Sequence, residues 1–104
     1  MATDLELRPG EIVQDEIKGD YWEKVLFMYS QKRGKIFITN QRIHVRVGFA
    51  TEFDIEMKDI AEIKKCNVSL FIPTGIDVRL KNGKTHRLSV LKRDERMETI
   101  QRFI

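Results

Sequence analysis

Residues 34–57 read GKIFITNQRIHVRVGFATEFDIEM, and this stretch decides the fold because its apolar residues recur at every second position. In segment 42–47 an apolar side chain follows each polar one, and segment 52–57 repeats the pattern. A period of two is typical of a β-strand with one buried face, whereas a helix would show a period near 3.6. The stretch therefore predicts antiparallel strands joined by tight turns.

The pairing register of these strands can be tested, because directly opposed residues of an antiparallel pair face the same side of the sheet. A two-residue turn at Asn40-Gln41, where asparagine suits a positive φ, opposes apolar residues on 35–39 and 42–47. A hairpin centred on Phe49 opposes apolar residues on one face and opposite charges on the other. The predicted pairs are Ile38 with Ile43, Ile36 with Val45, Val45 with Phe53, Ile43 with Ile55, Arg46 with Glu52, His44 with Asp54, and Arg42 with Glu56.

Weaker alternation on both sides of this stretch predicts further short strands. In the last hairpin, a two-residue turn at Asn82-Gly83 would place apolar residues of one strand opposite polar residues of the other. We therefore expect the three-residue loop Lys81-Asn82-Gly83, with Gly83 in the left-handed conformation. The further predicted strands are 11–17, 24–30, 60–65, 68–72, 76–81 and 84–90, and the loop pairs Val78 with His86 and Ile76 with Leu88.

Segment 92–104 changes to helical spacing, with Asp94 and Glu95 near its start, where the helix dipole favours acids. It predicts an amphipathic helix whose apolar stripe packs on the strands. The stripe consists of Met97, Ile100, Phe103 and Ile104. We expect a mainly β fold of about seven antiparallel strands with one C-terminal α-helix, in one domain over 1–104, with 1–9 as a flexible or loosely packed arm.

Residues 34–43, GKIFITNQRI, resemble the core signature of GRAM domains and of small bacterial pleckstrin-homology-like domains. Gly10-Glu11 and the segment from Asn82 to Leu88 ahead of 92–95 fit the same pattern, so the resemblance covers residues 10–104. It implies a pleckstrin-homology-like small β-barrel or sandwich. Relatives include lipid-headgroup binders and protein-interaction modules, and the fold alone does not choose between them.

The composition is that of a small globular domain. The chain of 104 residues is 41% hydrophobic and 34% charged, which is enough apolar material for one packed core. No apolar run approaches the roughly 20 residues of a membrane span, and residues 1–10 lack the apolar block of a secretory signal. Cys66 is the single cysteine, which excludes an internal disulfide and a multi-cysteine metal site. A cytoplasmic location is expected, with a membrane-peripheral one as the alternative.

The net charge of +3 is unevenly distributed, because residues 1–23 carry −5 and the remainder +8. A basic body favours phosphate-rich partners, although ordinary solvation of a small β domain explains the same charge. For an anionic phospholipid headgroup, the resemblance points to a loop at 31–35. The pleckstrin-homology headgroup signature ends in an arginine, however, where this sequence has Phe37. The cations of the predicted loop are Lys32, Arg33 and Lys35.

Pairing 24–30 with 35–39 in a hairpin sends three large apolar side chains to the outer face of the sheet. This register opposes Tyr29 to Ile36 and Phe27 to Ile38, and the outward residues are Leu26, Met28 and Phe37. Three neighbouring apolar groups require a cover. The cover is the N-terminal segment around Tyr21 and Trp22, a second copy of the chain, or an external partner or membrane.

Catalytic and nucleic-acid functions have little support in the sequence. His44 and His86 fall on different hairpins, and no nucleophile lies at a suitable spacing from a base, so we expect no enzyme and no cofactor or metal. Most phenylalanines point inward in the registers above, which leaves few aromatic rings to stack on bases. The leading hypothesis is protein binding or homo-oligomerisation through the outer apolar face. Peripheral binding of an anionic membrane through 31–35 is the alternative.

Overall fold

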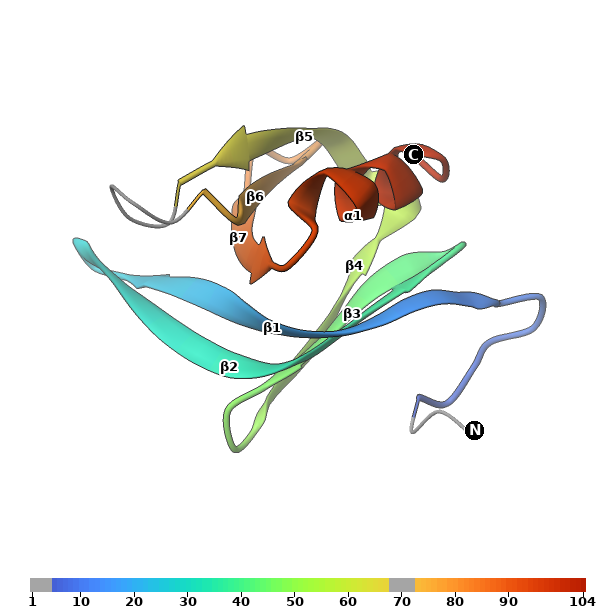
Figure 1. Ribbon diagram of the computed structural model, residues 1–104, viewed down its shortest axis with the longest axis horizontal. Coiled ribbons are helices and arrows are strands. Elements are labelled where there is room, and N and C mark those ends of the chain that lie inside the picture. The colour runs from blue at the N-terminus through green and yellow to red at the C-terminus, as the bar shows by residue number, and fades with distance from the viewer. Residues whose placement is uncertain (1–4, 68–72) are drawn as a thin grey trace.

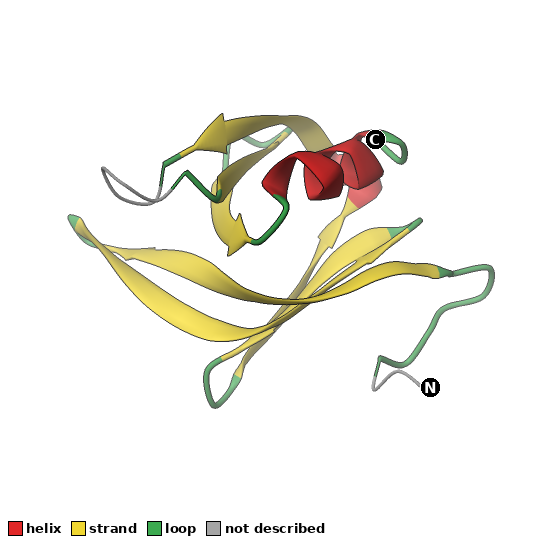
Figure 2. Ribbon diagram, viewed as in Figure 1, coloured by secondary structure: helices red, strands yellow, loops and turns green. Residues whose placement is uncertain are grey.

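The computed structural model describes residues 5–67 and 73–104. The strands within these residues form one antiparallel sheet in the order β4-β3-β2-β1-β7-β6-β5, which curls into a half-barrel with a helix across it (Figures 1 and 2). The elements are β1 (Val13–Val25), β2 (Met28–Thr39), β3 (Arg42–Val47), β4 (Thr51–Glu56), a short 3₁₀ turn η1 (Met57–Asp59), β5 (Ile60–Cys66), β6 (Gly75–Leu80), β7 (Thr85–Val90) and α1 (Arg93–Gln101).

The mainly β fold and its central registers are confirmed. Alternation alone placed both hairpins correctly, because a slip by one residue would move every apolar side chain to the wrong face. Gly83 has φ of +91°, as its place in the last hairpin loop requires. The observed pairs include Ile38 with Ile43, Ile36 with Val45, Val45 with Phe53, Ile43 with Ile55, Arg46 with Glu52, His44 with Asp54, Arg42 with Glu56, Val78 with His86 and Ile76 with Leu88.

The turn at Asn40-Gln41 forms differently from the prediction. The described non-glycine residues with positive φ are Leu26 and Lys92, so Asn40 does not supply a left-handed conformation. The hydroxyl of Thr39 closes the turn instead by accepting hydrogen bonds from the backbone N–H groups of Gln41 and Arg42, both at 3.0 Å. A side-chain acceptor can thus replace backbone geometry in a tight turn.

The predicted strand at 24–30 is wrong, because these residues belong to two strands and the turn between them. β1 runs unbroken to Val25, Leu26 and Phe27 form the turn, and β2 begins at Met28. Tyr29 consequently pairs with Lys24. Turns of this kind normally carry glycine, asparagine or aspartate, and their absence hid this one. The predicted strand 68–72 lies outside the described residues.

Two paired glycines lie at the row where the strands that flank the β1–β2 ribbon change over. Gly19 of β1 lies opposite Gly34 of β2, and this row continues to Val47 of β3 on one side and Val90 of β7 on the other. β3 pairs with β2 only from Gly34 onward, whereas β7 pairs with β1 only from Gly19 to Trp22. The two flanking strands therefore hold opposite halves of the long β1–β2 ribbon.

The hydrophobic core fills the concave side of the curled sheet, under α1. Of the predicted helix stripe, Ile100 is fully buried, Met97 and Phe103 pack against the core, and Ile104 is more exposed. The predicted helix limits of 92–104 were too wide at both ends. The buried core residues of the sheet include Ile17, Ile36, Ile38, Ile43, Val45, Ile55, Ile76, Val78 and Leu88.

Gly34 should tolerate no side chain. A Cβ atom at this position would overlap the carbonyl oxygen of Arg46 and lie 2.7 Å from Cα of Val47, both of which are backbone atoms that cannot move aside. We expect Gly34→Ala to lower the free energy of unfolding by about 1–3 kcal/mol or more in urea denaturation. Gly83→Asn is the control, because this position faces open space and asparagine tolerates positive φ. Equal stability of the two variants would contradict the packing argument.

Candidate functional site

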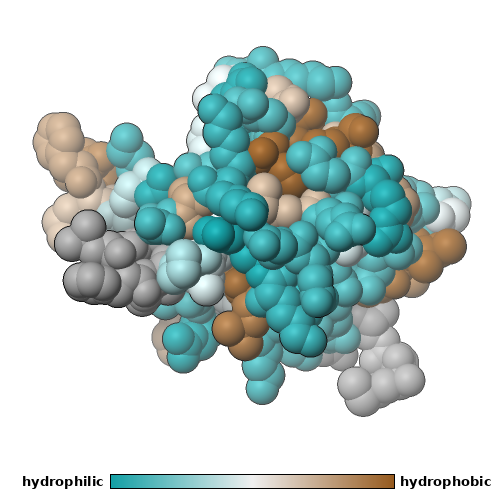
Figure 3. All heavy atoms as spheres, turned by 45° about the horizontal axis from the view of Figure 1, so that its top comes forward, coloured by the Kyte–Doolittle hydropathy of each residue, from teal (hydrophilic) through white to brown (hydrophobic). Residues whose placement is uncertain are grey.

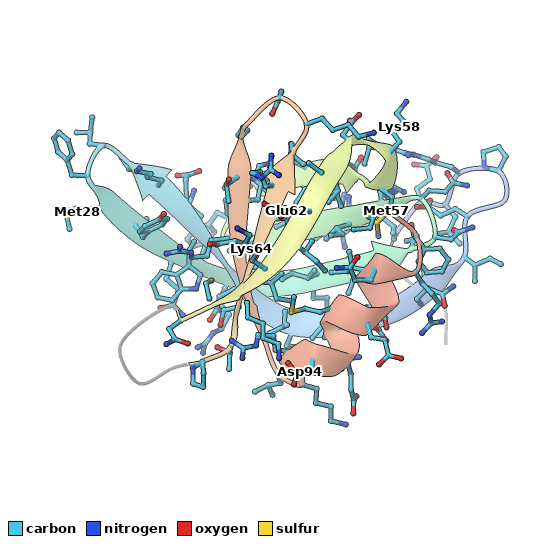
Figure 4. All side chains as sticks on the ribbon, turned by 90° about the horizontal axis from the view of Figure 1, so that it is seen from above. Met28, Met57, Lys58, Glu62, Lys64 and Asp94 are labelled. Carbon is cyan, nitrogen blue, oxygen red and sulfur yellow. The ribbon has the colours of Figure 1, made fainter. Side chains whose placement is uncertain are left out.

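The β1–β2 ribbon projects from the body as a finger, defined here as residues 23–30. Among the described residues, β1 and β2 pair only with each other in the finger, because β7 pairs with β1 no further than Trp22 and β3 pairs with β2 only from Gly34 onward. The finger ends at the left of Figure 1, and Met28 lies at the end farthest from the body in Figure 4. An isolated two-stranded ribbon has little stability of its own, so its anchorage at the base matters.

The tip of the finger carries four consecutive exposed apolar side chains. Phe27 is 99% exposed and Leu26 84%, and they are flanked by exposed Val25 and Met28. Figure 3 shows an apolar group projecting at the same end of the molecule. Single exposed apolar residues are ordinary on protein surfaces, but four in succession on a projecting turn make the tip the candidate contact site.

The backbone at the tip is strained as well as apolar. Leu26 has φ of +56°, a conformation that glycine or asparagine adopts readily and that costs leucine about 1–2 kcal/mol. A glycine would serve this turn better for stability alone. Strain that coincides with apolar exposure points to a functional use of the leucine side chain.

The sequence-based apolar face is only partly correct. Leu26 and Met28 are exposed together, but Phe37 is fully buried on the outer side of the sheet. The guanidinium of Arg46 lies over the Phe37 ring at 5.3 Å, and the ring of His44 lies 5.8 Å away. Phe37 is thus covered from within the chain, by Arg46 and His44 of β3.

The predicted basic loop at 31–35 is not a loop. These residues lie within β2, where successive side chains point to opposite faces, so Arg33 and Lys35 lie on one face and Lys32 on the other. Each cation also faces an acid of β1, which lowers its availability to a ligand. The pairs are Lys32 with Glu23 at 3.3 Å, Arg33 with Asp20 at 3.2 Å, and Lys35 with Glu16 at 3.3 Å.

A buried ion pair joins the N-terminal segment to the β2–β3 hairpin. Both carboxylate oxygens of Glu11 accept hydrogen bonds from the guanidinium of Arg42, at 2.7 and 3.0 Å. The hydroxyl of Thr39 and the backbone N–H of Arg8 also donate to Glu11. Arg42 was predicted to face Glu56, and it does so in register, but Glu56 instead binds the side chain of Arg8.

These contacts anchor the described part of the predicted arm. Arg42 donates a hydrogen bond to the carbonyl oxygen of Glu6 at 2.8 Å, and Leu5 is buried. Burial opposes ionisation of Glu11, but the hydrogen bonds from Arg42, the Arg8 backbone and Thr39 lower its pKa to about 2. Residues 5–8 are therefore held against the sheet by charge as well as by packing.

The histidines and the cysteine do not form a reactive group. His44 lies between Asp54 and Glu52 on the outer face, whereas His86 is buried beside the hydroxyl of Tyr21 at 2.8 Å. Burial lowers the pKa of His86 to about 4, which keeps the ring neutral. Burial and the neighbouring Asp77 carboxylate raise the pKa of Cys66 to about 11, so its thiol is a weak nucleophile at neutral pH.

The described residues hold no cluster of three or more histidine, cysteine or carboxylate side chains able to bind a metal ion. None of the helices within 5–67 and 73–104 has the length and apolar character needed to cross a bilayer.

Comparison with known proteins identifies the family. The sequence model of the GRAM domain matches residues 1–104, the whole length of the chain. The chain belongs to the GRAM domain family. GRAM domains are pleckstrin-homology-like modules for membrane or protein interaction and are not typically enzymes. The resemblance of residues 34–43 to the family signature is thereby confirmed.

A solved structure shares the fold of this GRAM domain. The C-terminal domain of an unknown protein from Leishmania infantum superposes with a TM-score of 0.76 at 24% sequence identity. The match covers 90% of the present chain and 84% of that domain. At this identity the likeness supports the fold alone. None of the curated proteins compared matches the chain.

The signature residues of this GRAM domain serve its structure. Gly34 permits the close approach of β2 and β3, and Glu11, Thr39 and Arg42 form the buried network. The exposed apolar tip of the finger lies outside these residues. Sequence reasoning did not assign Val25 and Phe27 to the exposed tip. The unbroken apolar run 25–29 could have indicated them, because it is too short for a buried helix and lacks a turn residue.

The buried network should make stability depend on pH. Because the pKa of Glu11 is lowered from 4.5 to about 2 in the folded chain, its carboxylate stabilises the fold above pH 4.5, and this contribution disappears as the pH falls towards 2. We expect the stability difference between the wild type and Glu11→Gln to shrink steadily across this interval in urea denaturation. Glu98→Gln, at an exposed position of α1, is the control. A difference independent of pH would contradict the role of Glu11.

Proposed function

We propose that this GRAM domain binds membranes peripherally, with the finger tip as the part that enters the bilayer. The supporting observation is the run of exposed apolar side chains on a projecting, strained turn. Burying one such side chain contributes about 1.5–3 kcal/mol, so Leu26, Phe27 and Met28 together offer about 5–9 kcal/mol before ordering costs. This is enough for weak, reversible binding.

The shape of the tip favours a bilayer over a protein surface. A stable protein interface buries about 800 Å² and some 20–30 residues on each side, with complementary shapes. The tip offers four convex apolar residues with no adjoining apolar surface from β3 or β7, whose pairing has ended before the finger begins. A bilayer accepts a convex wedge without needing a matching pocket, and the boundary of headgroups and acyl chains accommodates apolar side chains about 5–10 Å deep.

The charge of the chain also fits this proposal. Lys24 is exposed and directly precedes the apolar tip. The chain carries a net charge of +3, which would draw the molecule towards an anionic leaflet. Apolar insertion and charge attraction together provide the two contributions that stable peripheral binding usually requires.

Phe27→Asp tests the apolar contact directly. Replacing an inserted ring with a carboxylate should weaken binding to phosphatidylcholine vesicles containing phosphatidylserine by about tenfold or more, measured by sedimentation. Ile12→Asp is the matched control, because Ile12 is also exposed but lies just before β1, at the opposite end of the long ribbon from the finger. Retained binding by Phe27→Asp would exclude the tip as the inserted part. A dimer in light scattering that this variant dissociates, without vesicle binding by the wild type, would favour self-association instead.

Leu26→Gly separates stability from binding. Glycine relieves the positive φ of residue 26 but removes an exposed side chain, so the free energy of unfolding should stay unchanged or rise by up to about 1 kcal/mol. Vesicle binding should fall at the same time, because one apolar group is lost from the tip. A variant that is less stable and binds vesicles normally would contradict a functional use of Leu26.

A further inference from the structure

The first part of β2 has an unpaired edge. β2 pairs with β1 from Met28 to Thr39, but β3 joins it on the other side only from Gly34 onward. In Figure 1, β2 forms the lower border of the finger, on the side away from β7. Residues 28–31, called here the open edge, therefore have no neighbouring strand on that side among the described residues.

The backbone groups of Tyr29 and Gln31 point towards this unpaired side. In an antiparallel pair, the N–H and the C=O of one residue point to the same neighbouring strand, and the direction alternates along the chain. The carbonyl oxygen of Arg33 accepts a hydrogen bond from the N–H of Gly48 at 3.1 Å, on the β3 side. Gln31 and Tyr29 lie two and four residues before Arg33 in the same strand, so their N–H and C=O groups also point away from β1.

The side chains of these two residues leave the open edge uncovered. The guanidinium of Arg87 lies over the ring of Tyr29 at 4.7 Å, and Asp20 accepts a hydrogen bond from the side-chain amide of Gln31 at 2.6 Å. Asp20 belongs to β1 and Arg87 to β7, which both lie on the other side of β2 from the open edge. An extended segment can thus reach the backbone groups without displacing either side chain.

The two outer edges of the sheet are protected, whereas the open edge is not. Residues 52–56 of β4 carry an acid at every second position, and residues 62–65 of β5 carry three charges. At the end of β5, Arg93 also donates a hydrogen bond to the carbonyl oxygen of Cys66. Charged and covering groups of this kind prevent an edge from pairing with another chain. The open edge has the sequence Met-Tyr-Ser-Gln, without a charge or a proline.

The charges beside the open edge favour an acidic partner. An added strand lies about 4.8 Å from β2 and twice as far from β1. It would stand directly beside Lys32, whereas Glu23, the acid that lies 3.3 Å from the Lys32 ammonium, belongs to β1, one strand further away. The row after Lys32 is already occupied by Gly48, so the added strand has one end at Lys32. An acid at that end of the strand matches the site.

We infer that the open edge binds an extended segment of a partner protein, which adds to the sheet as an antiparallel strand in line with β3. The backbone groups of Tyr29 and Gln31 hold the segment by hydrogen bonds. Its preferred sequence has an acid opposite Lys32 and a β-branched residue opposite Tyr29, because such pairs stabilise antiparallel strands. The third strand also supports a finger that otherwise has only two. This inference goes beyond membrane binding, since it leaves the tip of the finger free.

The probe is a capped peptide, Asp-Thr-Thr-Val-Val, which in the antiparallel direction places its aspartate opposite Lys32 and its first valine opposite Tyr29. We expect the backbone N–H signals of Tyr29 and Gln31 to shift in an NMR titration without vesicles. The peptide Lys-Thr-Thr-Val-Val should bind about threefold more weakly, because it brings two like charges together. Unmoved signals of Tyr29 and Gln31 would overturn the site, and equal binding of the two peptides would overturn its acidic partner.

Gln31→Pro tests the backbone contact, with Gln31→Ala as the matched control. Proline removes the N–H that points to the open edge and none of the hydrogen bonds to β1, whereas alanine removes the same side chain and keeps the N–H. We expect the proline variant to bind the acidic peptide about tenfold more weakly than the alanine variant, while their melting temperatures agree within about 5 °C. Equal binding by the two variants would contradict strand addition. If the proline variant does not fold, the two peptides still test the site on the wild type.

Two controls separate this inference from the other uses of the finger. Binding of Gln31→Pro to vesicles containing phosphatidylserine should stay within about twofold of the wild type, because the apolar tip is unchanged. A tenfold loss there as well would show that proline disrupts the whole finger, and would overturn the assignment to the edge. A wild-type dimer in light scattering that Gln31→Pro dissociates and Gln31→Ala retains would assign the open edge to a second copy of the chain and overturn the partner segment. The peptide titrations contain no vesicles, so they stand whether or not the domain binds membranes.

Discussion

The structure depends on the close approach of backbones at the row where Gly19 pairs with Gly34. At this row alone β3 and β7 both flank the β1–β2 ribbon, and each then continues along a different half of it. The flanking backbones can approach there because neither residue carries a Cβ. Beyond Trp22 neither β3 nor β7 flanks the ribbon, and this unflanked end is the finger. The finger is therefore a consequence of how the core is built.

The buried pair of Glu11 and Arg42 lies at the other end of the ribbon from the finger. It ties residues before β1 to the β2–β3 hairpin, and every oxygen of its carboxylate has a donor. Burying an ion pair is worthwhile only when its hydrogen bonds are complete, as they are here. The residues that resemble the GRAM signature, among them Gly34, Thr39 and Arg42, thus hold the scaffold and lie outside the finger.

Much of the fold could be predicted because the alternation of apolar and polar residues along a strand is a local signal. A register error of one residue would move every buried side chain to the solvent face. Ile43, Val45 and Phe53 reach the core only in one register, and that register also opposes Arg46 to Glu52. The candidate site could not be predicted in the same way. Leu26 occupies a turn position that local preference assigns to glycine, so the run around it was interpreted as a strand. Sequence reasoning fails most readily where a protein departs from local preference, and such departures concentrate at functional sites.

The sequence by itself determined the strands, their pairing in the central hairpins and the C-terminal helix, because these follow from periodicity over a few residues. Only the tertiary structure decided that Phe37 is covered by Arg46, that β2 continues through Lys32 and Arg33, and that the Arg87 guanidinium lies over the ring of Tyr29. These relations join residues far apart in the chain, or depend on where one long strand ends its pairing with another. Periodicity specifies which face a side chain takes, whereas the curvature of the whole sheet decides what stands opposite it.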